Sequence, residues 1–116
     1  TTVWVLQSTV TMTTLNFTSN QATTGGGLMI QTQSTVTLSQ SVFITNTATS
    51  SGGGIYIDGN SILNANTVTS TNNSAIYYGG FVWGLYCTLN SQNAADTGNS
   101  AQKGGAYLLF GSTTTF

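Results

Sequence analysis

Asn46-Thr47-Ala48, followed by Gly52-Gly53-Gly54-Ile55-Tyr56-Ile57, is the stretch that decides the fold, because it returns in weakening copies along the chain. An Asn-x-Ala motif begins at four positions that are 26, 27 and 26 residues apart: Asn20, Asn46, Asn73 and Asn99. Each Asn-x-Ala motif is followed by a Gly-Gly pair and an apolar residue. These stretches are Gly26-Gly27-Leu28, Gly53-Gly54-Ile55, Gly79-Gly80-Phe81 and Gly104-Gly105-Ala106. Self-similarity at a fixed period of about 20 to 50 residues is the signature of a repeat architecture. We therefore expect repeating structural units over the whole sequence.

Each unit also has a marker 12 residues before its asparagine. The markers are Ser8, Ser34, Ser61 and Cys87, and we place the beginnings of four coils near them. The residues that follow alternate between apolar and polar, as Val10 and Met12 do in the first copy, which indicates a strand with one buried face. A second short strand is expected before each asparagine, and a third after each Gly-Gly pair.

Three short strands in each turn of 26 or 27 residues predict a parallel β-helix. A Gly-Gly pair would cost an α-helix about 1 kcal/mol per residue, and Thr, Val and Ile favour a pleated surface. A blade of a β-propeller needs about 40 to 45 residues, which is too long for this repeat. We predict an all-β solenoid of about four and a half coils, in which equivalent residues stack about 4.8 Å apart.

Stacking of the coils predicts columns of equivalent residues. One column is Val10, Val36, Leu63 and Leu89, a second is Trp4, Ile30, Ile57, Trp83 and Leu108, and a third is Leu28, Ile55 and Phe81. Asn20, Asn46, Asn73 and Asn99 should form a structural ladder at a corner, each side chain donating to one neighbour and accepting from the other. Phe17 and Phe43 are replaced by Ser70 and Asp96 in the later copies. We therefore expect weaker packing toward the C-terminal end.

The charge count limits what the chain can bind. It contains one Lys or Arg, two acidic residues and no His or Pro, whereas about a quarter of the residues in an average domain are charged. A single basic residue cannot neutralise a row of phosphates, so we expect no nucleic-acid partner. No run of about 18 apolar residues is present, so we expect no membrane insertion. A nearly uncharged chain rich in Thr, Ser and Asn predicts an extracellular or cell-surface protein, and Cys87 is expected to be a buried thiol.

A combined motif, Phe-x-x-Asn followed by Gly-Gly and an aliphatic residue, occurs twice. It is formed by Phe17-Thr18-Ser19-Asn20 with Gly26-Gly27-Leu28, and by Phe43-Ile44-Thr45-Asn46 with Gly53-Gly54-Ile55. This pattern resembles the repeats of chlamydial polymorphic outer-membrane proteins and, more broadly, of autotransporter-like β-helix passengers. The resemblance implies a right-handed parallel β-helix at a cell surface that serves adhesion or builds a stalk.

The residue inventory gives little support to catalysis. Polysaccharide lyases and hydrolases built on β-helices need clustered carboxylates, a basic residue that acts as base, or a calcium site made of several acids. Asp58 and Asp96 are the only acids and stand at different phases of the repeat, and no His is available for proton transfer or metal binding. We predict a non-enzymatic protein with no catalytic, cofactor-binding or metal-binding residues. A carbohydrate-binding or polysaccharide-degrading β-helix is the alternative.

Outward-facing threonines suggest a further alternative. Thr9-Val10-Thr11 and Thr35-Val36-Thr37 stand at the same phase of successive coils, so their threonines should form a two-by-two patch. Such an array could bind ice or another flat surface. Ile62 and Asn64 stand at the same positions of the third coil and interrupt it, and outward Thr is also ordinary strand composition.

Two sequons mark candidate N-glycosylation sites for a eukaryotic secretory pathway. They are Asn16-Phe17-Thr18 and Asn72-Asn73-Ser74, with Asn16 and Asn72 as the acceptors. Glycans on these residues would help a chain with so few charges to stay soluble.

Self-association is the partner interaction that the repeat predicts. A coil is stable only when coils above and below cover it, and neither terminal stretch shows a charged or Pro-containing capping segment. We expect residues 1–116 to be one β-helix segment of a longer solenoid, or a filament subunit whose copies stack end to end, since a head-to-tail contact that does not close gives a filament. The predicted function is a structural rod or filament subunit of an extracellular appendage, stalk or adhesin.

Overall fold

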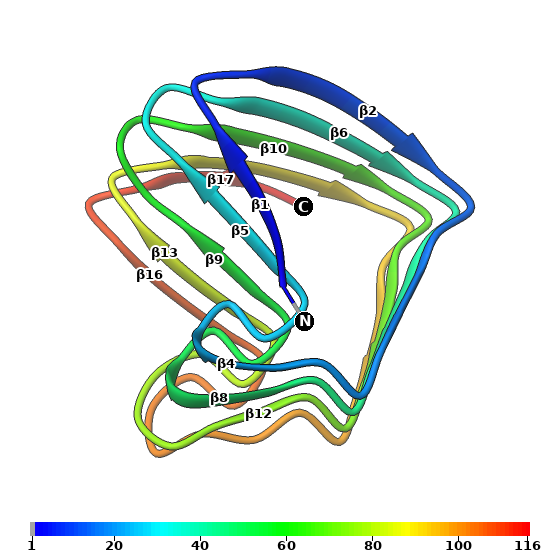
Figure 1. Cartoon of the computed structure of the whole chain (residues 1–116), viewed down its shortest axis with the longest axis vertical. Helices are drawn as coiled ribbons and strands as arrows, with labels where there is room; N and C mark the ends of the chain where they lie inside the picture. The colour runs from blue at the N-terminus through cyan, green and yellow to red at the C-terminus, as the bar shows by residue number, and fades with distance from the viewer. Residues whose placement is uncertain (1) are drawn as a thin grey trace.

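The chain winds as a solenoid through four walls, and each wall is a parallel sheet made of equivalent strands from successive coils (Figure 1). The computed structural model describes residues 2–116, so residue 1 of the predicted segment lies outside the described residues. Within residues 2–116 the structure contains strands and turns and no helix. Each coil runs clockwise in Figure 1 and the blue N-terminal coil lies in front of those that follow, so the winding is right-handed. The predicted parallel β-helix is confirmed.

The walls are numbered in the order in which the chain enters them. Wall 1 contains β1 (Val3–Leu6), β5 (Leu28–Gln31), β9 (Ile55–Ile57), β13 (Val82–Leu85) and β16 (Tyr107–Phe110). Wall 2 contains β2 (Thr9–Thr13), β6 (Thr35–Ser39), β10 (Ile62–Asn66), β14 (Thr88–Gln92) and β17 (Thr113–Thr115). Wall 3 contains β3 (Asn16–Thr18), β7 (Val42–Ile44), β11 (Thr69–Thr71) and β15 (Ala95–Thr97). Wall 4 contains β4 (Gln21–Thr24), β8 (Thr47–Ser51) and β12 (Ser74–Ala75).

Wall 4 is a set of strands that the sequence pattern does not predict. The pattern gives three strands per coil, whereas the first three coils each have a fourth strand after the ladder asparagine. These strands consist of Gln, Thr, Ser and Ala and lack large apolar residues. Their inward residues are the stacked alanines Ala22, Ala48 and Ala75, whose small side chains give a weak alternation signal.

The predicted coil starts are stacked in one column at the corner between walls 1 and 2. The backbone N–H of Ser8 donates to Ser34 Oγ at 3.2 Å, and that of Ser34 donates to Ser61 Oγ at 3.1 Å. The backbone N–H of Cys87 donates in the same way to Ser112 Oγ. The serine side chains therefore hold successive corners together through a backbone donor at the start of each wall 2 strand.

The register of wall 1 corrects the second predicted column. The inward column is Val5, Ile30, Ile57, Gly84 and Leu109, and the outward column is Trp4, Met29, Tyr56, Trp83 and Leu108. The predicted column takes the residue four positions before each coil start. For Ser34 and Ser61 that residue is Ile30 or Ile57, which faces inward. The corner before Ser8 or Cys87 is one residue shorter, so the same count reaches outward-facing Trp4 or Trp83. A shift of one residue along a strand moves a side chain to the opposite face of the sheet.

Phe81 also belongs to a different column from the one predicted. The inward column that contains Leu28 and Ile55 begins with Val3 and continues with Val82 and Tyr107. Phe81 is instead equivalent to the last glycine of each triplet, and the Gly54 N–H donates to the Phe81 carbonyl at 3.0 Å. The pairs Gly79-Gly80 and Gly104-Gly105 therefore match the first two residues of the earlier glycine triplets.

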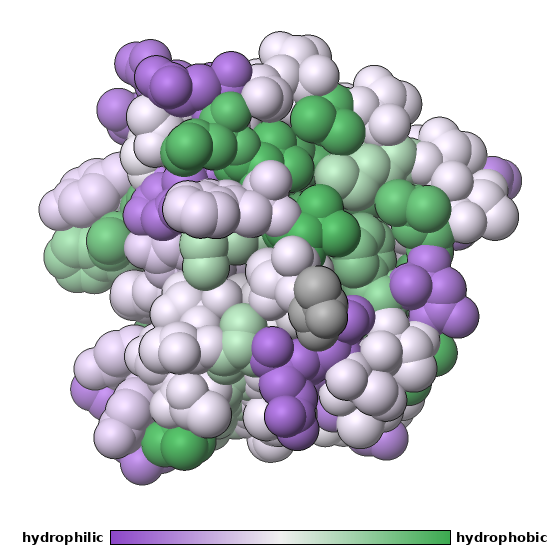
Figure 2. Space-filling model, viewed as in Figure 1, coloured by the Kyte–Doolittle hydropathy of each residue, from purple (hydrophilic) through white to green (hydrophobic). Residues whose placement is uncertain are grey.

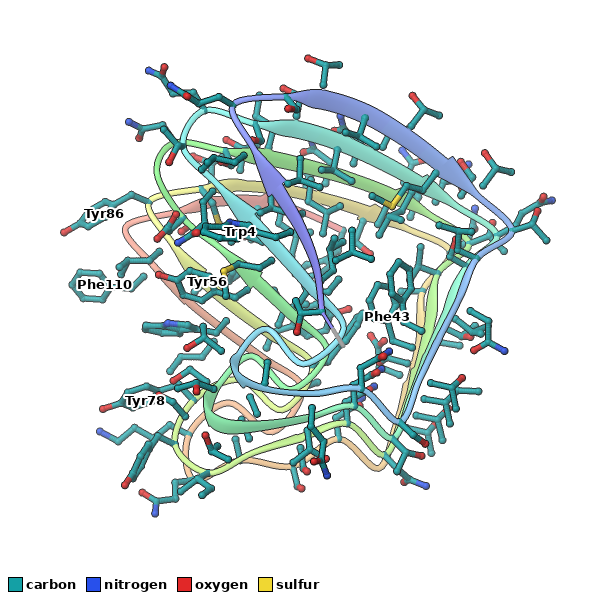
Figure 3. All side chains as sticks on the ribbon, in the orientation of Figure 1. Trp4, Phe43, Tyr56, Tyr78, Tyr86 and Phe110 are labelled. Carbon is teal, nitrogen blue, oxygen red and sulfur yellow. The ribbon has the colours of Figure 1, made fainter. Side chains whose placement is uncertain are left out.

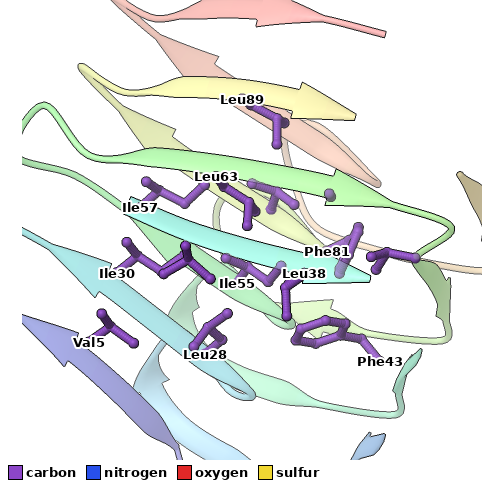
Figure 4. Close-up of a cluster of buried hydrophobic side chains, with 14 of the residues drawn as sticks. Val5, Leu28, Ile30, Leu38, Phe43, Ile55, Ile57, Leu63, Phe81 and Leu89 are labelled. Atoms are coloured by element: carbon purple, nitrogen blue, oxygen red, sulfur yellow. The ribbon is translucent and has the colours of Figure 1, made fainter. Parts of the chain in front are cut away.

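The core is a continuous apolar stack along the solenoid axis (Figure 4). The predicted column of Val10, Val36, Leu63 and Leu89 is confirmed by the register of wall 2. Phe17 and Phe43 stack with ring centroids 4.4 Å apart and an interplanar angle of 8°. Phe81, which lies directly before β13, then contacts Phe43 with centroids 5.4 Å apart. The expected weakening of the core is therefore offset in the third coil, because Phe81 fills space that Ser70 leaves.

Candidate functional site

The ladder asparagines lie where wall 3 turns into wall 4. The Nδ2 atoms of Asn20, Asn46 and Asn73 donate to Oδ1 of the next asparagine at 3.0, 2.9 and 3.0 Å, respectively, and Asn99 ends the series. Each accepting Oδ1 also receives the backbone N–H of the donating residue. Asn46 and Asn73 are fully buried and additionally donate to the carbonyls of Phe17 and Phe43. The side-chain oxygen and nitrogen atoms of Asn46 and Asn73 therefore form hydrogen bonds within the fold and are not available to a ligand.

The structure places the two acidic residues on different walls. Asp58 follows β9 at the outer side of wall 1, and Asp96 lies in β15 of wall 3. Lys103 is exposed and pairs through its backbone with Tyr78. Across residues 2–116, no three Asp, Glu, His or Cys side chains come together as a set of metal ligands.

Asp58 is held by a hydrogen-bonded relay on the outer face of wall 1. The Tyr56 hydroxyl donates to Asp58 Oδ2 at 2.7 Å, and Gln31 Nε2 donates to the same oxygen at 3.2 Å. Trp4 Nε1 in turn donates to Gln31 Oε1 at 2.8 Å. Burial raises the pKa of the Tyr56 phenol above its ordinary value, and the hydrogen bond to Asp58 and the charge of that carboxylate raise it further. The relay thus links three successive coils on the surface and fixes the indole of Trp4.

Asp96 replaces the phenylalanine of the earlier coils and organises a polar cluster there. It stands at the same register position as Ser70 and Phe43. The hydroxyls of Ser70 and Tyr107 donate to its two oxygens, at 2.5 and 2.7 Å, respectively. Asn99 Nδ2 donates to Ser70 Oγ at 2.9 Å and so joins the ladder to this cluster. Burial, followed by the hydrogen bond to Asp96 and its charge, raises the pKa of the Tyr107 phenol.

Aromatic side chains gather outside wall 1 and form what we call the aromatic face. Figure 3 shows Trp4, Tyr56, Tyr78, Tyr86 and Phe110 on this side of the solenoid, with Phe43 inside it. Together with Trp83, the first five of these residues define the aromatic face. The face is well exposed, since Trp4 and Phe110 have exposed fractions of 63% and 57%. Sequence reasoning places Trp4 and Trp83 in an inner column; the signal that identifies this face is the alternation within β13.

A groove of about 320 Å³ lies beside Trp4 at the N-terminal end of the aromatic face. It runs between the outer side of wall 1 and the residues of β4. Its lining is Thr2, Trp4, Ala22, Thr23, Thr24 and Met29. The groove thus combines an indole and a thioether with three threonine hydroxyls.

The groove is filled by the chain itself farther along the solenoid. Thr24, Ser51, Tyr78 and Lys103 are equivalent residues of successive coils. The Tyr78 ring stacks on Trp83 with centroids 5.1 Å apart and an interplanar angle of 29°. Thr24 has no ring to place beside Met29, the equivalent of Trp83 two coils earlier. The same surface therefore carries an open position at β5 and an occupied one at β13.

Both sequon asparagines are exposed. Asn16 lies in β3, and its Oδ1 accepts a hydrogen bond from the hydroxyl of Thr18, the third residue of the sequon. Asn72 lies at the left-handed corner before Asn73, with φ of 54°. Its Oδ1 lies against Gly98, where an added Cβ would clash with it. The two sites are thus accessible at the surface in different local settings.

The outward threonines of wall 2 stack in register. Thr9 pairs with Thr35 and Thr11 with Thr37, and the same columns continue with Ile62 and Asn64. Asn64 Oδ1 accepts from Asn90 Nδ2 at 2.8 Å. The face outside wall 2 is therefore polar, in contrast to the aromatic face outside wall 1.

Cys87 is a buried free thiol at the corner between walls 1 and 2. Its Sγ lies 3.4 Å from Ser112 Oγ. Burial raises the pKa of the thiol, and the hydrogen bonds with Ser112 and Leu85 offset part of that effect. The expectation of a buried thiol is confirmed.

Comparison of the chain with protein-family models, with curated proteins and with solved structures found no match. Among the described residues, no helix has the length and apolar character needed to cross a membrane. The fold and the surface chemistry of residues 2–116 are therefore the basis for a functional proposal.

Proposed function

We propose that this chain is a non-enzymatic structural element of an extracellular rod, stalk, filament or adhesin, and that its coils pair with further coils through the edges of the walls. The observation that carries the proposal is the parallel pairing of every wall, whose register is continuous in walls 1 to 3 and shifts once in wall 4, between Ala22 and Thr24. The outermost strands are β1, β2, β3 and β4 at one end and β16, β17, β15 and β12 at the other. An edge strand presents a row of backbone donors and acceptors that is a template for another strand.

The side chains at the N-terminal end support the same proposal. Val3 and Leu6 of β1 and Leu15 after β2 are exposed large apolar residues. Figure 2 looks onto this end and shows apolar side chains gathered around its centre. Exposed apolar patches mark interaction surfaces in soluble proteins. A further coil placed on β1 and β2 would cover these side chains as the second coil covers the first.

The additional coils can come from two sources, and in both cases they pair with the edge strands of this chain. They can belong to the same polypeptide or to another copy of this chain stacked end to end, which gives an open filament when the contact does not close. A chain with one basic and two acidic residues has little charge repulsion to oppose such stacking. Exposed Asn16 and Asn72 would carry N-glycans if the chain passes through a eukaryotic secretory pathway.

A proline in β2 tests the edge pairing. The Ser8 carbonyl accepts from the Thr35 N–H, so it points toward the second coil. In a strand, the N–H and C=O of one residue point to the same side, and this side alternates from each residue to the next. The backbone groups of Ser8 point toward β6, so those of Thr11, three residues later, point to the free edge. Thr11→Pro removes that donor and leaves the pairing with β6, since proline is tolerated at edge positions whose N–H has no partner. Thr11→Ser keeps the amide and serves as the matched control.

Sedimentation velocity and electron microscopy of the isolated chain provide the measurement. We expect concentration-dependent end-to-end assembly of the unmodified chain and of Thr11→Ser, and a shift toward the monomer in Thr11→Pro. A monomer at all concentrations for the unmodified chain would contradict assembly between copies. Equal assembly of the Pro and Ser variants would contradict pairing through β2.

A further inference from the structure

We propose that the groove beside Trp4 binds a neutral hexopyranose unit of a glycan, with one face of the sugar ring stacked on the exposed indole. The groove measures about 320 Å³, which is within the range of about 300 to 1,000 Å³ that small-molecule sites occupy. This site goes beyond the structural role, because it adds ligand recognition to one side of the solenoid.

The chain itself shows what kind of group fits at this position. In the third coil the ring of Tyr78 lies on Trp83, with centroids 5.1 Å apart. In the first coil the equivalent of Tyr78 is Thr24, which leaves the groove open. A six-membered ring therefore has a place beside Trp4 and Met29 that corresponds to the place of Tyr78 beside Trp83.

The lining distinguishes a sugar ring from an aromatic side chain. A pyranose presents C–H groups on its faces and hydroxyls around its edge, so it can meet an aromatic ring and polar groups at the same time. Trp4 and Met29 offer the apolar surface, and Thr23 and Thr24 offer hydroxyls that donate and accept. The Thr2 hydroxyl donates to the carbonyls of Gly25 and Gly26, so it offers the ligand only an acceptor. An apolar ring from a protein partner would leave these hydroxyls without matching groups, and burial of unmatched polar groups reduces affinity.

The indole is fixed before any ligand arrives. Trp4 Nε1 donates to Gln31 Oε1 at 2.8 Å, and Gln31 Nε2 donates to Asp58 Oδ2 at 3.2 Å. This relay orients the ring although its exposed fraction is 63%. A platform held in its bound orientation loses less conformational entropy on binding.

The charges near the groove favour a neutral ligand. Asp58 is the charged side chain of the relay, and an acidic sugar would approach a carboxylate of like sign. Lys103, the one basic residue of the sequence, lies at the position equivalent to Thr24 three coils away. Among residues 2–116, the lining of the groove thus contains no cationic side chain that could bind an acidic glycan.

Titration with defined tetrasaccharides tests the proposal. The probes are cellotetraose, maltotetraose and tetra-N-acetylchitotetraose at millimolar concentrations, with tetragalacturonate as the acidic comparison. Binding is followed by tryptophan fluorescence and by the NMR shift of the Trp4 indole N–H. We expect at least one neutral tetrasaccharide to bind and to move the Trp4 signal, and tetragalacturonate to bind at least tenfold more weakly. Trp4→Ala should weaken binding at least tenfold, which corresponds to about 1.4 kcal/mol of lost ring contact.

Two variants of Thr24 provide the matched comparison. Thr24→Tyr places a ring beside Met29 as Tyr78 lies beside Trp83, so it should fill the groove and reduce affinity at least tenfold. Thr24→Ser keeps the hydroxyl and the open groove and should bind like the unmodified chain. Phe110→Ala removes an exposed ring of the aromatic face outside the groove and should leave the affinity unchanged.

Several outcomes would overturn the proposal. They are the absence of binding to all three neutral probes, unchanged affinity in Trp4→Ala or Thr24→Tyr, and tetragalacturonate binding as tight as that of the neutral sugars. Circular dichroism and unfolding curves of each variant establish that it is folded, so that loss of binding is not loss of structure. The groove lies at the N-terminal edge on which a further coil would pair, so binding is measured at concentrations at which sedimentation velocity shows a monomer. Under this condition Thr11→Pro addresses edge pairing and Trp4→Ala the groove, and either proposal can fail without the other.

Discussion

Phe81 packs against Phe43 with ring centroids 5.4 Å apart, although the residues equivalent to Phe81 in the two preceding coils are Gly27 and Gly54. Ser70 stands where the earlier coils have Phe17 and Phe43. The third coil thus supplies its aromatic ring from the corner before β13 instead of from wall 3. Gly54 makes room for it, since a Cβ there would lie 2.5 Å from Phe81 Cδ1.

Removing the Phe81 ring should destabilise the solenoid strongly. Phe81→Ala deletes a side chain that is only 3% exposed, and such truncations cost about 3 to 5 kcal/mol. Phe81→Leu retains most of the apolar contact and should cost clearly less. The free energy of unfolding from urea titration measures both effects. A cost below about 1 kcal/mol for Phe81→Ala would mean that the ring does not support the core as described.

Gly54→Ala tests the same contact from the other side. The added methyl group would meet the Phe81 ring, and overpacking of a close-packed core costs about 1 to 3 kcal/mol. In the double variant with Phe81→Ala, this additional cost should largely disappear, because the two side chains are in direct contact and their effects should not add. Additive costs in the double-mutant cycle would contradict the contact.

The asparagine ladder should be most sensitive at its centre. Asn73→Ala removes two donated and two accepted hydrogen bonds at a fully buried position. Each buried polar group left without a partner costs about 1 to 3 kcal/mol, so we expect a total loss of about 3 kcal/mol or more. Asn20→Ala, at a half-buried position, should cost about 1 kcal/mol.

Asn73→Asp distinguishes hydrogen bonding from packing in the ladder, because it keeps the shape and removes both donors. An aspartate carboxylate would face Asn99 Oδ1 and the Phe43 carbonyl, so this variant should be less stable at neutral pH than at acid pH, where the carboxyl regains a proton. Urea unfolding of the three ladder variants at two pH values provides the measurement. Equal costs for Asn73→Ala and Asn20→Ala, or no dependence of Asn73→Asp on pH, would contradict this description.

The sequence contains the period, the strands of walls 1 to 3 and the position of each ladder asparagine. It does not show which way Trp4 and Trp83 face. The corner between walls 1 and 2 is one residue shorter before Ser8 than before Ser34, and no residue type in the corner indicates this difference in length. Wall 4 is hidden for another reason: its inward residues Ala48 and Ala75 are buried, but side chains this small give only a weak hydrophobic signal. Contacts between walls, such as that of Phe81 with Phe43, depend on three-dimensional packing and are absent from a linear pattern.

The groove at Trp4 illustrates the same limit. Its lining residues come from two separate stretches, 2–4 and 22–29. Thr24 resembles any strand threonine until it is compared with Tyr78 at the equivalent position. A register error of one residue would place Trp4 inside and remove the site altogether. Correct pairing of the coils is therefore required before a surface site on a solenoid can be recognised.

Alkaline pH should destabilise the protein through its hydrogen-bonded tyrosines. Burial and the adjacent carboxylates raise the phenol pKa of Tyr56 and Tyr107 in the folded state, whereas the unfolded chain releases these protons near the ordinary pKa of about 10. As the pH rises, the unfolded chain thus loses these protons before the folded chain does. The two phenols should therefore not change the free energy of unfolding below about pH 9, and they should lower it above about pH 10.

Tyr107→Phe provides the comparison for this pH dependence. The variant removes the titrating phenol and the hydrogen bond to Asp96 Oδ2, so it should be less stable at neutral pH by about 1 kcal/mol. Its stability should also fall less steeply above pH 10 than that of the unmodified chain. Urea unfolding across pH 7 to 11 measures both effects, and parallel curves for the two proteins would contradict a raised pKa of Tyr107.

Cys87 should react slowly with alkylating reagents as long as the protein is folded. The thiolate is the reactive form, and both burial of the side chain and the raised pKa of its thiol reduce the thiolate available at neutral pH. We expect iodoacetamide to modify the native chain at least 100-fold more slowly than the chain in urea. Ser112→Ala removes a hydrogen bond that offsets part of the pKa increase, so its native thiol should titrate at higher pH. Mass spectrometry of time-resolved alkylation follows both proteins, and a native rate equal to that in urea would show that the corner around Cys87 is open in solution.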